Sequence, residues 1–278
     1  MSFRLTLNAR WKAVDSLLCV GLDPDPDRIP AHLGSGHKAI ATFCRGIIDA
    51  TAGQVCAFKP QIAYFHAMAA ESVLVELIDY IHATHPGIPV ILDAKRGDIG
   101  QTARQYAAEA FERYHADALT VSPFMGFDSI EPYLDWEGRG VILLCRTSNP
   151  GGSDFQSLQT DGERLFERIA RLAAGPWNRG GELGLVIGAT FPAELRRVRQ
   201  IAPDLPFLVP GIGAQGGDID ATVEAGLDGQ GGGLVINSSR AILFAGKGED
   251  YADAARQASI TARDAIRQAV RRFGPRTG

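Results

Sequence analysis

A short stretch of alternating charges is the part of this sequence best suited to acid–base chemistry. Asp93, Lys95 and Asp98 lie close together in the segment DAKRGD, directly after an apolar run. Asp93 and Lys95 are two positions apart, so in an extended chain their side chains face the same way. Lys59 follows another apolar run and would lie beside them if the two strands are neighbours. Lysines and aspartates that alternate in this way hold one another in the charged form.

This charge cluster has two interpretations. It could be a purely structural group of salt bridges. It could instead face a pocket, where it would supply an ammonium group as an acid and carboxylates that repel an anionic group.

A second candidate site lies further along the chain, in the segment 211–216 (GIGAQG). It has the GxGxxG spacing of dinucleotide-binding proteins, but those also place an acidic residue at the end of the next strand. Here the next apolar run is followed by 237–240 (NSSR), which favours a phosphate site over an NAD site. Glycines let backbone N–H groups approach an anion, and Arg240 adds a charged donor.

The elements that must position these groups are short apolar runs separated by helical patterns. The runs are rich in Val, Ile and Leu, as in strands buried on both faces of a parallel sheet. We expect strands at 17–22, 54–58, 88–92, 117–121, 140–145, 184–188, 206–209 and 233–236. We expect helices at 62–84, 100–114, 161–174, 192–202, 217–226 and 249–273, with an additional helix at 5–14 before the first strand.

The alternation of strands and helices predicts the fold class, α/β. Eight strands, each followed by a helix, is the count of a (β/α)8 TIM barrel, and a doubly wound open sheet is the main alternative. No linker divides the chain, so we expect a single barrel domain over 1–278 with an extra N-terminal helix. In a barrel, the polar residues after the strands meet at one mouth, where such enzymes place their chemistry. These residues include Asp23 after the first strand and Thr147, Ser148 and Asn149 after the fifth.

Composition and charge exclude several classes of protein. The net charge of −4 gives no sign of a basic surface for nucleic acid or membrane. We find neither a signal peptide nor the roughly 20 apolar residues of a membrane span, so we expect a cytoplasmic protein. The four cysteines form no CxxC pair, which is typical of buried reduced thiols. His82 and His85 lack a third ligand at useful spacing, so we expect no metal site.

Several segments together resemble orotidine 5′-monophosphate decarboxylases, in particular the longer bacterial subfamily that carries DAKRGDI. They are FKPQ (58–61), DAKRGDIGQTA (93–103), TSNPGG (147–152), VPGIGAQGGD (209–218) and INSSRAI (236–242). The resemblance implies a homodimeric TIM barrel that converts orotidine 5′-monophosphate to uridine 5′-monophosphate and CO2, the last step of de novo UMP synthesis. It implies no metal and no organic cofactor.

The resemblance also implies a role for each matching residue. Lys59, Asp93, Lys95 and Asp98 look like the family's Lys-Asp-Lys-Asp array. In it, Lys95 protonates C6 as CO2 leaves, and Asp93 lies against the substrate carboxylate. Asp98, with Ile99 and Thr102, would reach into the partner subunit's site. The remaining substrate contacts would be Asp23 and Lys59 to the ribose, Ser148 to the pyrimidine, and Gln215 and Arg240 to the phosphate.

This chain departs from the family pattern in two places. Asn237 and Ser238 stand where many members have a glycine-rich stretch before the arginine. The loop after the fifth strand is long, so Thr147 could stand in the place assigned to Ser148.

Two other functions compete with this one. A related sugar-phosphate decarboxylase or epimerase would use Mg2+ and need an acidic ligand near the second strand, where FKPQ offers Lys59. A non-catalytic phosphate-binding barrel would not need the intact set of Asp93, Lys95 and Asp98.

Overall fold

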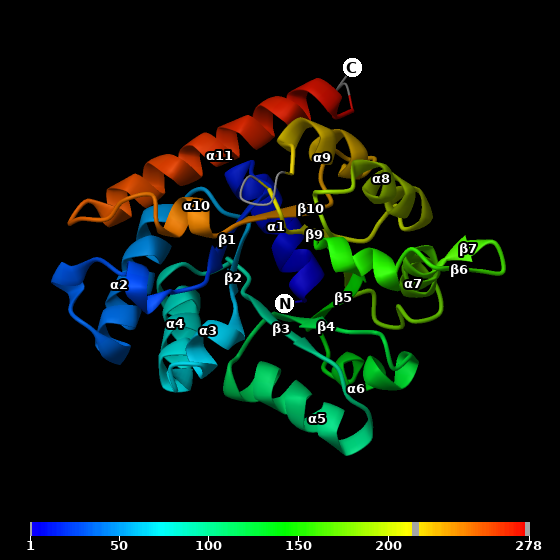
Figure 1. The fold of residues 1–278 in the computed structure, drawn as a ribbon, viewed down its shortest axis with the longest axis horizontal. Helices are drawn as coiled ribbons and strands as arrows, with labels where there is room; N and C mark the ends of the chain where they lie inside the picture. The colour runs from blue at the N-terminus through cyan, green and yellow to red at the C-terminus, as the bar shows by residue number, and fades with distance from the viewer. Residues whose placement is uncertain (1, 213–216, 276–278) are drawn as a thin grey trace.

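The apolar runs of the sequence form the strands of one parallel sheet, and the sheet curls into a barrel (Figure 1). The structure is a computed structural model that describes residues 2–212 and 217–275 of the chain. The barrel strands are β1 (Leu18–Leu22), β2 (Ala57–Pro60), β3 (Ile91–Arg96), β4 (Ala118–Val121), β5 (Gly140–Arg146), β8 (Leu183–Ile187), β9 (Phe207–Val209) and β10 (Leu234–Ser238).

The order of the strands decides between the two expected folds. The order is β2-β1-β10-β9-β8-β5-β4-β3, and the two end strands meet through isolated parallel bridges. These bridges join Phe58 to Val90 and Gln61 to Asp93, so the sheet closes on itself. The TIM barrel predicted from the sequence is therefore confirmed, and the open doubly wound sheet is excluded.

Strands β2 and β3 extend further toward their carboxyl ends than the apolar runs at 54–58 and 88–92 predicted. The parallel ladder continues into polar residues, because Gly21 of β1 pairs with Lys59 and Val121 of β4 pairs with Arg96. Lys59, Asp93 and Lys95 consequently lie on strands rather than in the loops after them, which gives them a rigid support.

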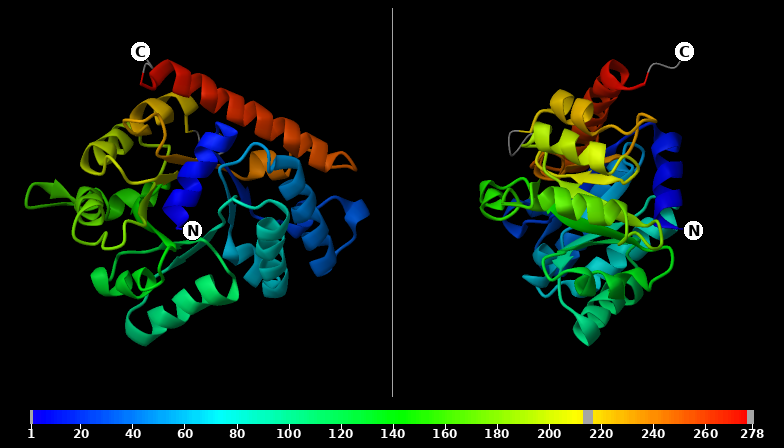
Figure 2. Two further views of the ribbon diagram at one scale, coloured as in Figure 1. Left: turned by 180° about the vertical axis from the view of Figure 1, so that it is seen from behind. Right: turned by 90° about the vertical axis from the view of Figure 1, so that its right-hand side faces the viewer.

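Helices cover the barrel on its outside and across one end (Figures 1 and 2). They are α1 (Phe3–Val14), α2 (Gly36–Thr51), α3 (Ile62–His66), α4 (Glu71–Thr84), α5 (Gly100–Ala108), α6 (Glu131–Leu134), α7 (Leu165–Ala174), α8 (Pro192–Ile201), α9 (Ile219–Gly226), α10 (Arg240–Leu243) and α11 (Tyr251–Phe273). The expected segment 100–114 is α5 followed by one π-helical turn, Glu109–Arg113. Helices α2, α6 and α10 were not among the expected segments.

Two of the expected helices were wrong in part. The segment 62–84 is two helices, α3 and α4, because Ala69 adopts φ 49° and turns the chain between them. The segment 161–174 begins as a hairpin of β6 (Gln159–Thr160) and β7 (Glu163–Arg164), and helix α7 starts only at Leu165. Its turn residues Asp161 and Gly162 both have positive φ, the conformation of a two-residue hairpin turn.

The expected N-terminal helix is present as α1, and it covers one end of the barrel (Figure 2). Phe3 and Leu7 of this helix are buried against residues that point into the barrel from every strand. A Cβ on Gly140, at the start of β5, would lie 2.3 Å from the Phe3 ring, so α1 packs at the amino ends of the strands. The carboxyl ends of the strands are left to form the mouth.

Candidate active site

A cavity of about 220 Å3 lies at the carboxyl ends of β1, β2, β3, β9 and β10. Four residues expected in the site line it: Asp23, Lys59, Asp93 and Arg240. Gln61, Tyr64, Asn237 and Ser238 line it as well. A larger hollow of about 290 Å3 between α1 and α11 contains none of the expected site residues. We therefore take the cavity at the mouth as the candidate site.

Lys59 contributes a buried ammonium group to this cavity. Lys59 as a whole is 4% exposed, and its Nζ lies 2.9 Å from Oδ2 of Asp93. Burial alone would lower the pKa of Lys59, but the nearby carboxylates of Asp93 and Asp23 outweigh it and raise the pKa above its usual value. Lys59 is therefore a fixed positive charge.

Asp93 is held through both of its carboxylate oxygens. Oδ2 accepts from Lys59, while Oδ1 accepts from Lys95 Nζ at 2.6 Å and from the Thr120 hydroxyl at 2.9 Å. Burial would raise the pKa of Asp93, but the two ammonium groups more than compensate, and the pKa falls well below its usual range. Asp93 is thus ionised between two cations.

Lys95 reaches Asp93 through a backbone conformation that an extended chain does not have. Its φ is 46°, in the left-handed region, and the register of β3 shifts between Leu92 and Arg96. Asp93 and Lys95 do bring their side chains together, as expected, but not through the extended backbone that the expectation assumed. A non-glycine residue in this region costs about 1–3 kcal/mol, and surrounding contacts must hold it there.

Thr120 of β4 is the contact that holds this backbone. Its hydroxyl oxygen accepts hydrogen bonds from the N–H groups of Ala94 and Lys95, both at 3.0 Å, while the hydroxyl itself donates a hydrogen bond to Asp93. One donor and two acceptors are all that a hydroxyl has, so Thr120 is fully used. The Lys95 side chain is 46% exposed and is not part of the cavity lining, which it meets through its ion pair with Asp93. Sequence reasoning missed Thr120, since one threonine in a buried strand carries no signal.

Asp98, Ile99 and Thr102 lie where β3 leads into α5. Oδ1 of Asp98 accepts from the backbone N–H of Ile99 at 2.8 Å. Within residues 2–212 and 217–275, no hydrogen bond or ion pair joins Asp98 to Lys59, Asp93 or Lys95. Ile99 is 44% exposed and Thr102 is exposed. One chain therefore brings together three members of the expected array and leaves the fourth outside.

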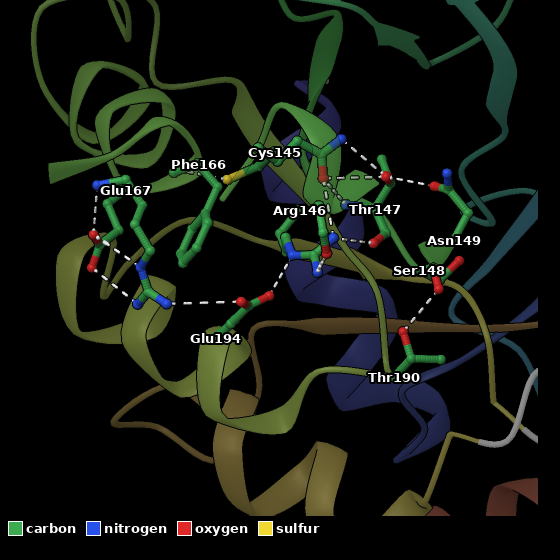
Figure 3. A network of polar contacts seen from close by, with 12 residues as sticks. Cys145, Arg146, Thr147, Ser148, Asn149, Phe166, Glu167, Thr190 and Glu194 are labelled. Atoms are coloured by element: carbon green, nitrogen blue, oxygen red, sulfur yellow. Dashed lines mark hydrogen bonds and ion pairs between the residues drawn. The ribbon is translucent and has the colours of Figure 1, made fainter. Parts of the chain in front are cut away.

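Thr147 and Ser148, which follow β5, differ in how their hydroxyls are used. Thr147 Oγ1 donates to Asn149 Oδ1 at 2.7 Å and accepts from Gln156 Nε2 at 3.0 Å. In the described part of the chain, the Ser148 hydroxyl makes no such bond, although the Ser148 carbonyl accepts from Thr190 at 3.0 Å (Figure 3). Ser148 is thus the hydroxyl with capacity left for a ligand.

The side of the cavity formed by β1 and β10 has polar atoms without partners in the described residues. These buried acceptors are Asp23 Oδ1 and Asn237 Oδ1. Arg240 begins α10 and is exposed. Gln215 lies outside the described residues. An anionic ligand with hydroxyl groups fits this side, because hydroxyls donate to the buried acceptors and Arg240 carries the opposite charge.

His82 and His85, the histidine pair noted in the sequence, each contact a different aspartate. His82 Nε2 lies 2.9 Å from Asp117 and His85 Nε2 lies 2.8 Å from Asp49, so the two histidines face different partners. Over the described ranges, no group of three His, Cys, Asp or Glu side chains is placed to hold a metal ion. The four cysteines are free and buried, and burial raises the pKa of Cys56 to about 12. Among the described helices, none combines the length and the apolar character needed to cross a bilayer.

Comparison with known proteins relates the whole barrel to one group. The sequence model of the "Orotidine 5′-phosphate decarboxylase / HUMPS family" matches residues 16–257. The chain is 66% identical to an orotidine 5′-phosphate decarboxylase of Azoarcus sp. over 266 residues, covering 96% of this chain and 98% of that protein. Identity to the one of Dechloromonas aromatica is 65%, with the same coverage. The solved OMP decarboxylase of Leishmania donovani superimposes with a TM-score of 0.86 at 41% identity, covering 97% of this chain and 99% of that one.

Proposed function

We propose a mechanism for this chain from the premise that it belongs to the orotidine 5′-phosphate decarboxylase family. Its reaction is the decarboxylation of orotidine 5′-monophosphate to uridine 5′-monophosphate and CO2, the last step of de novo UMP synthesis. One observation carries the mechanism: Asp93, which lines the cavity together with Lys59, lies ionised between the ammonium groups of Lys59 and Lys95.

We propose that Lys95 is the proton donor. When the bond between C6 and the carboxylate breaks, its electron pair stays on C6. The mechanism we propose has no organic cofactor that would accept this electron pair. A fixed ammonium group stabilises this developing charge and then transfers a proton to C6, which leaves Lys95 as the amine. Asp93 would face the substrate carboxylate and repel it, which raises the energy of the bound substrate relative to the transition state.

The other groups would bind the rest of the nucleotide. We assign the ribose to Asp23 and Lys59, and the phosphate to Arg240 and Gln215. The buried acceptor on Asp23 supports the first assignment, since a ribose hydroxyl would satisfy it. We assign the pyrimidine to Ser148 rather than Thr147, because the Thr147 hydroxyl already has two partners.

We propose that the enzyme is a homodimer in which Asp98, Ile99 and Thr102 enter the partner subunit's site. Apolar side chains exposed beside α5 support this assembly. Ile99 is 44% exposed, and Phe124 and Met125, in the loop before Phe127–Ser129, are 81% and 50% exposed. The Phe127–Ser129 turn contacts α5. Exposed apolar residues gathered in this way are typical of protein interfaces.

The remaining proposals concern the chain as a whole. We propose that residues 1–278 act as one barrel domain. We also propose a cytoplasmic location, which the four free cysteines support, because reduced thiols are typical of that compartment.

The activity is tested directly by mixing the purified protein with orotidine 5′-monophosphate and following the loss of orotate absorbance. We expect complete conversion, with the same rate after dialysis against EDTA. A rate lost in EDTA and restored by Mg2+ would contradict the absence of a metal. Binding of the nucleotide without any loss of absorbance would instead identify a non-catalytic barrel.

A further inference from the structure

The peptide that carries Ser148 is held by residues outside the cavity (Figure 3). The Thr190 hydroxyl, just after β8, donates to the Ser148 carbonyl at 3.0 Å. On the other side, Arg146 Nη1 donates to the Thr147 carbonyl at 3.1 Å, and Gln156 Oε1 accepts from the Thr147 N–H at 2.9 Å. Both peptides next to the Ser148 Cα are therefore fixed by side chains.

Ser148 also lies very close to the backbone of Gly188, the residue directly after β8. A Cβ on Gly188 would be 2.5 Å from the Cα of Ser148 and 2.6 Å from its nitrogen. No side chain fits there, and the N–H of Gly188 donates to the carbonyl of Arg146 at 2.7 Å. The backbone at the end of β8 is thus packed directly against the backbone of Ser148.

Arg146 makes this support rigid from behind. Its side chain is 1% exposed, its guanidinium lies 3.7 Å from the centre of the Phe191 ring, and its Nη2 donates to Ser153 at 2.9 Å. It is also paired with Glu194 of α8, whose other oxygen lies 3.8 Å from Arg164. A buried charge with this many partners is expensive to displace, so the start of the loop is held in one position.

We propose that Thr190 is a positioning residue for the reaction: its hydroxyl fixes the Ser148 peptide, so that the Ser148 hydroxyl meets the pyrimidine. This inference rests on the proposed contact of Ser148 with the base. Thr190 acts through Ser148, because its only hydroxyl proton is used on the Ser148 carbonyl. Groups that bind a reacting ring must be held within about half an ångström, which is why such a support matters.

A double-mutant cycle tests the proposal, with kcat/KM for orotidine 5′-monophosphate as the measurement. Thr190→Val keeps the shape and removes the hydroxyl, and Ser148→Ala removes the group it positions. We expect Ser148→Ala to lose roughly tenfold, about 1.4 kcal/mol. Thr190→Val should lose roughly fivefold in the wild-type background but less than about twofold in the Ser148→Ala background, because coupled residues are not additive.

Two further variants separate positioning from general stability. Thr190→Ser restores the hydroxyl and should recover most of the activity. Thr51→Val is the matched control, since Thr51 donates to the Ile47 carbonyl inside α2, and kcat/KM should not change. Thermal unfolding of each variant shows whether the fraction of folded enzyme is the same.

Each outcome has one meaning. If Thr190→Val lowers kcat/KM by the same factor in the wild-type and the Ser148→Ala backgrounds, Thr190 does not act through Ser148. Full activity of Thr190→Val would remove its role altogether. Full activity of Ser148→Ala would contradict the proposed pyrimidine contact, and with it the proposal, while the decarboxylase activity itself would stand.

Discussion

The two sides of the cavity are built in different ways. On the side of β2 and β3, Lys59 and Asp93 are 4% and 7% exposed, and each oxygen of Asp93 already has a charged partner. On the side of β1 and β10, Asp23 and Asn237 carry buried acceptors without a partner in the described residues, and Arg240 is exposed. We call the first the reactive side and the second the nucleotide-binding side, after the roles proposed for them. Within one chain, Lys59, Asp93 and Lys95 of the reactive side are already paired with one another, whereas the nucleotide-binding side has acceptors that we expect the substrate to satisfy.

This difference indicates how binding energy and catalysis are divided. Charges that are already in place need no rearrangement when the transition state forms, so they lower the barrier efficiently. Contacts made far from the reacting carbon can instead supply the free energy that closes the site around the substrate. The reactive side should therefore control kcat and the nucleotide-binding side should control affinity.

The most severe test of this division is Lys95→Ala. We expect kcat to fall by at least three orders of magnitude, more than about 4 kcal/mol, because the variant removes an interaction made chiefly in the transition state. The measurement is single-turnover decarboxylation at saturating substrate. Retention of more than about a tenth of the wild-type kcat, a loss under about 1.4 kcal/mol, would assign proton transfer to another group.

A second test asks whether the reactive side is completed by the partner subunit. We mix the inactive variants Lys95→Ala and Asp98→Ala and let their subunits exchange. If Asp98 acts in the neighbouring site, each mixed dimer has one intact site, and random pairing restores about a quarter of wild-type activity. No recovery, with exchange confirmed by differently tagged subunits, would show that the site is not shared in this way.

The reactive side should also influence stability, and Asp93→Asn measures this. Removing the carboxylate leaves the buried Lys59 unpaired and should lower the free energy of unfolding by roughly 3–5 kcal/mol at pH 7. Because the folded pKa of Asp93 is lowered, its contribution is present above the ordinary aspartate pKa of about 4 and disappears as the pH falls through the folded value.

Urea unfolding of the wild type and of Asp93→Asn from pH 7 downward checks that sign. The gap between the two should narrow as the pH falls below about 4. Arg240→Ala is the control from the other side of the cavity, and it should change stability by less than about 0.5 kcal/mol because Arg240 is exposed. A gap that widens in acid would show that Asp93 is not stabilised in its ionised form.

Arg240→Ala should have the smallest effect on the chemistry itself. It should weaken nucleotide binding by roughly 2–5 kcal/mol if the bound phosphate and Arg240 form a buried charge pair, since the phosphate then loses its charged partner. Decarboxylation of the nucleoside orotidine, which has no phosphate, should hardly change. Equal losses with both substrates would mean that Arg240 supports the structure rather than the phosphate.

Sequence reasoning succeeded where the information is local. The barrel follows from the recurring apolar runs, and the Lys59, Asp93 and Lys95 array follows from charges placed at the ends of those runs and from the resemblance. Even the missed hairpin had a local signal, the Asp161-Gly162 turn.

It failed where a distant element decides. The left-handed backbone of Lys95 exists because Thr120 of the next strand accepts two N–H groups, and Thr190 meets Ser148 because β8 lies beside β5. The break at Ala69 was missed for a different reason: it is a local helix end, closed by the Ala70 N–H donating to the Phe65 carbonyl at 2.9 Å, and nothing in the helical pattern of 62–84 marks it. Contacts between strands can be located only after the strands themselves are in place.

The Lys59–Asp93 ion pair also lies at the place where the barrel closes. Seven of the eight junctions between strands are paired ladders, whereas β2 and β3 meet through isolated bridges, so this junction is the seam of the cylinder. Lys59 lies on β2 and Asp93 on β3, so their 2.9 Å ion pair joins the two strands across this junction. Opening this junction would separate two of the charges to which we assign the reaction, so we expect the activity to depend on the barrel staying closed here.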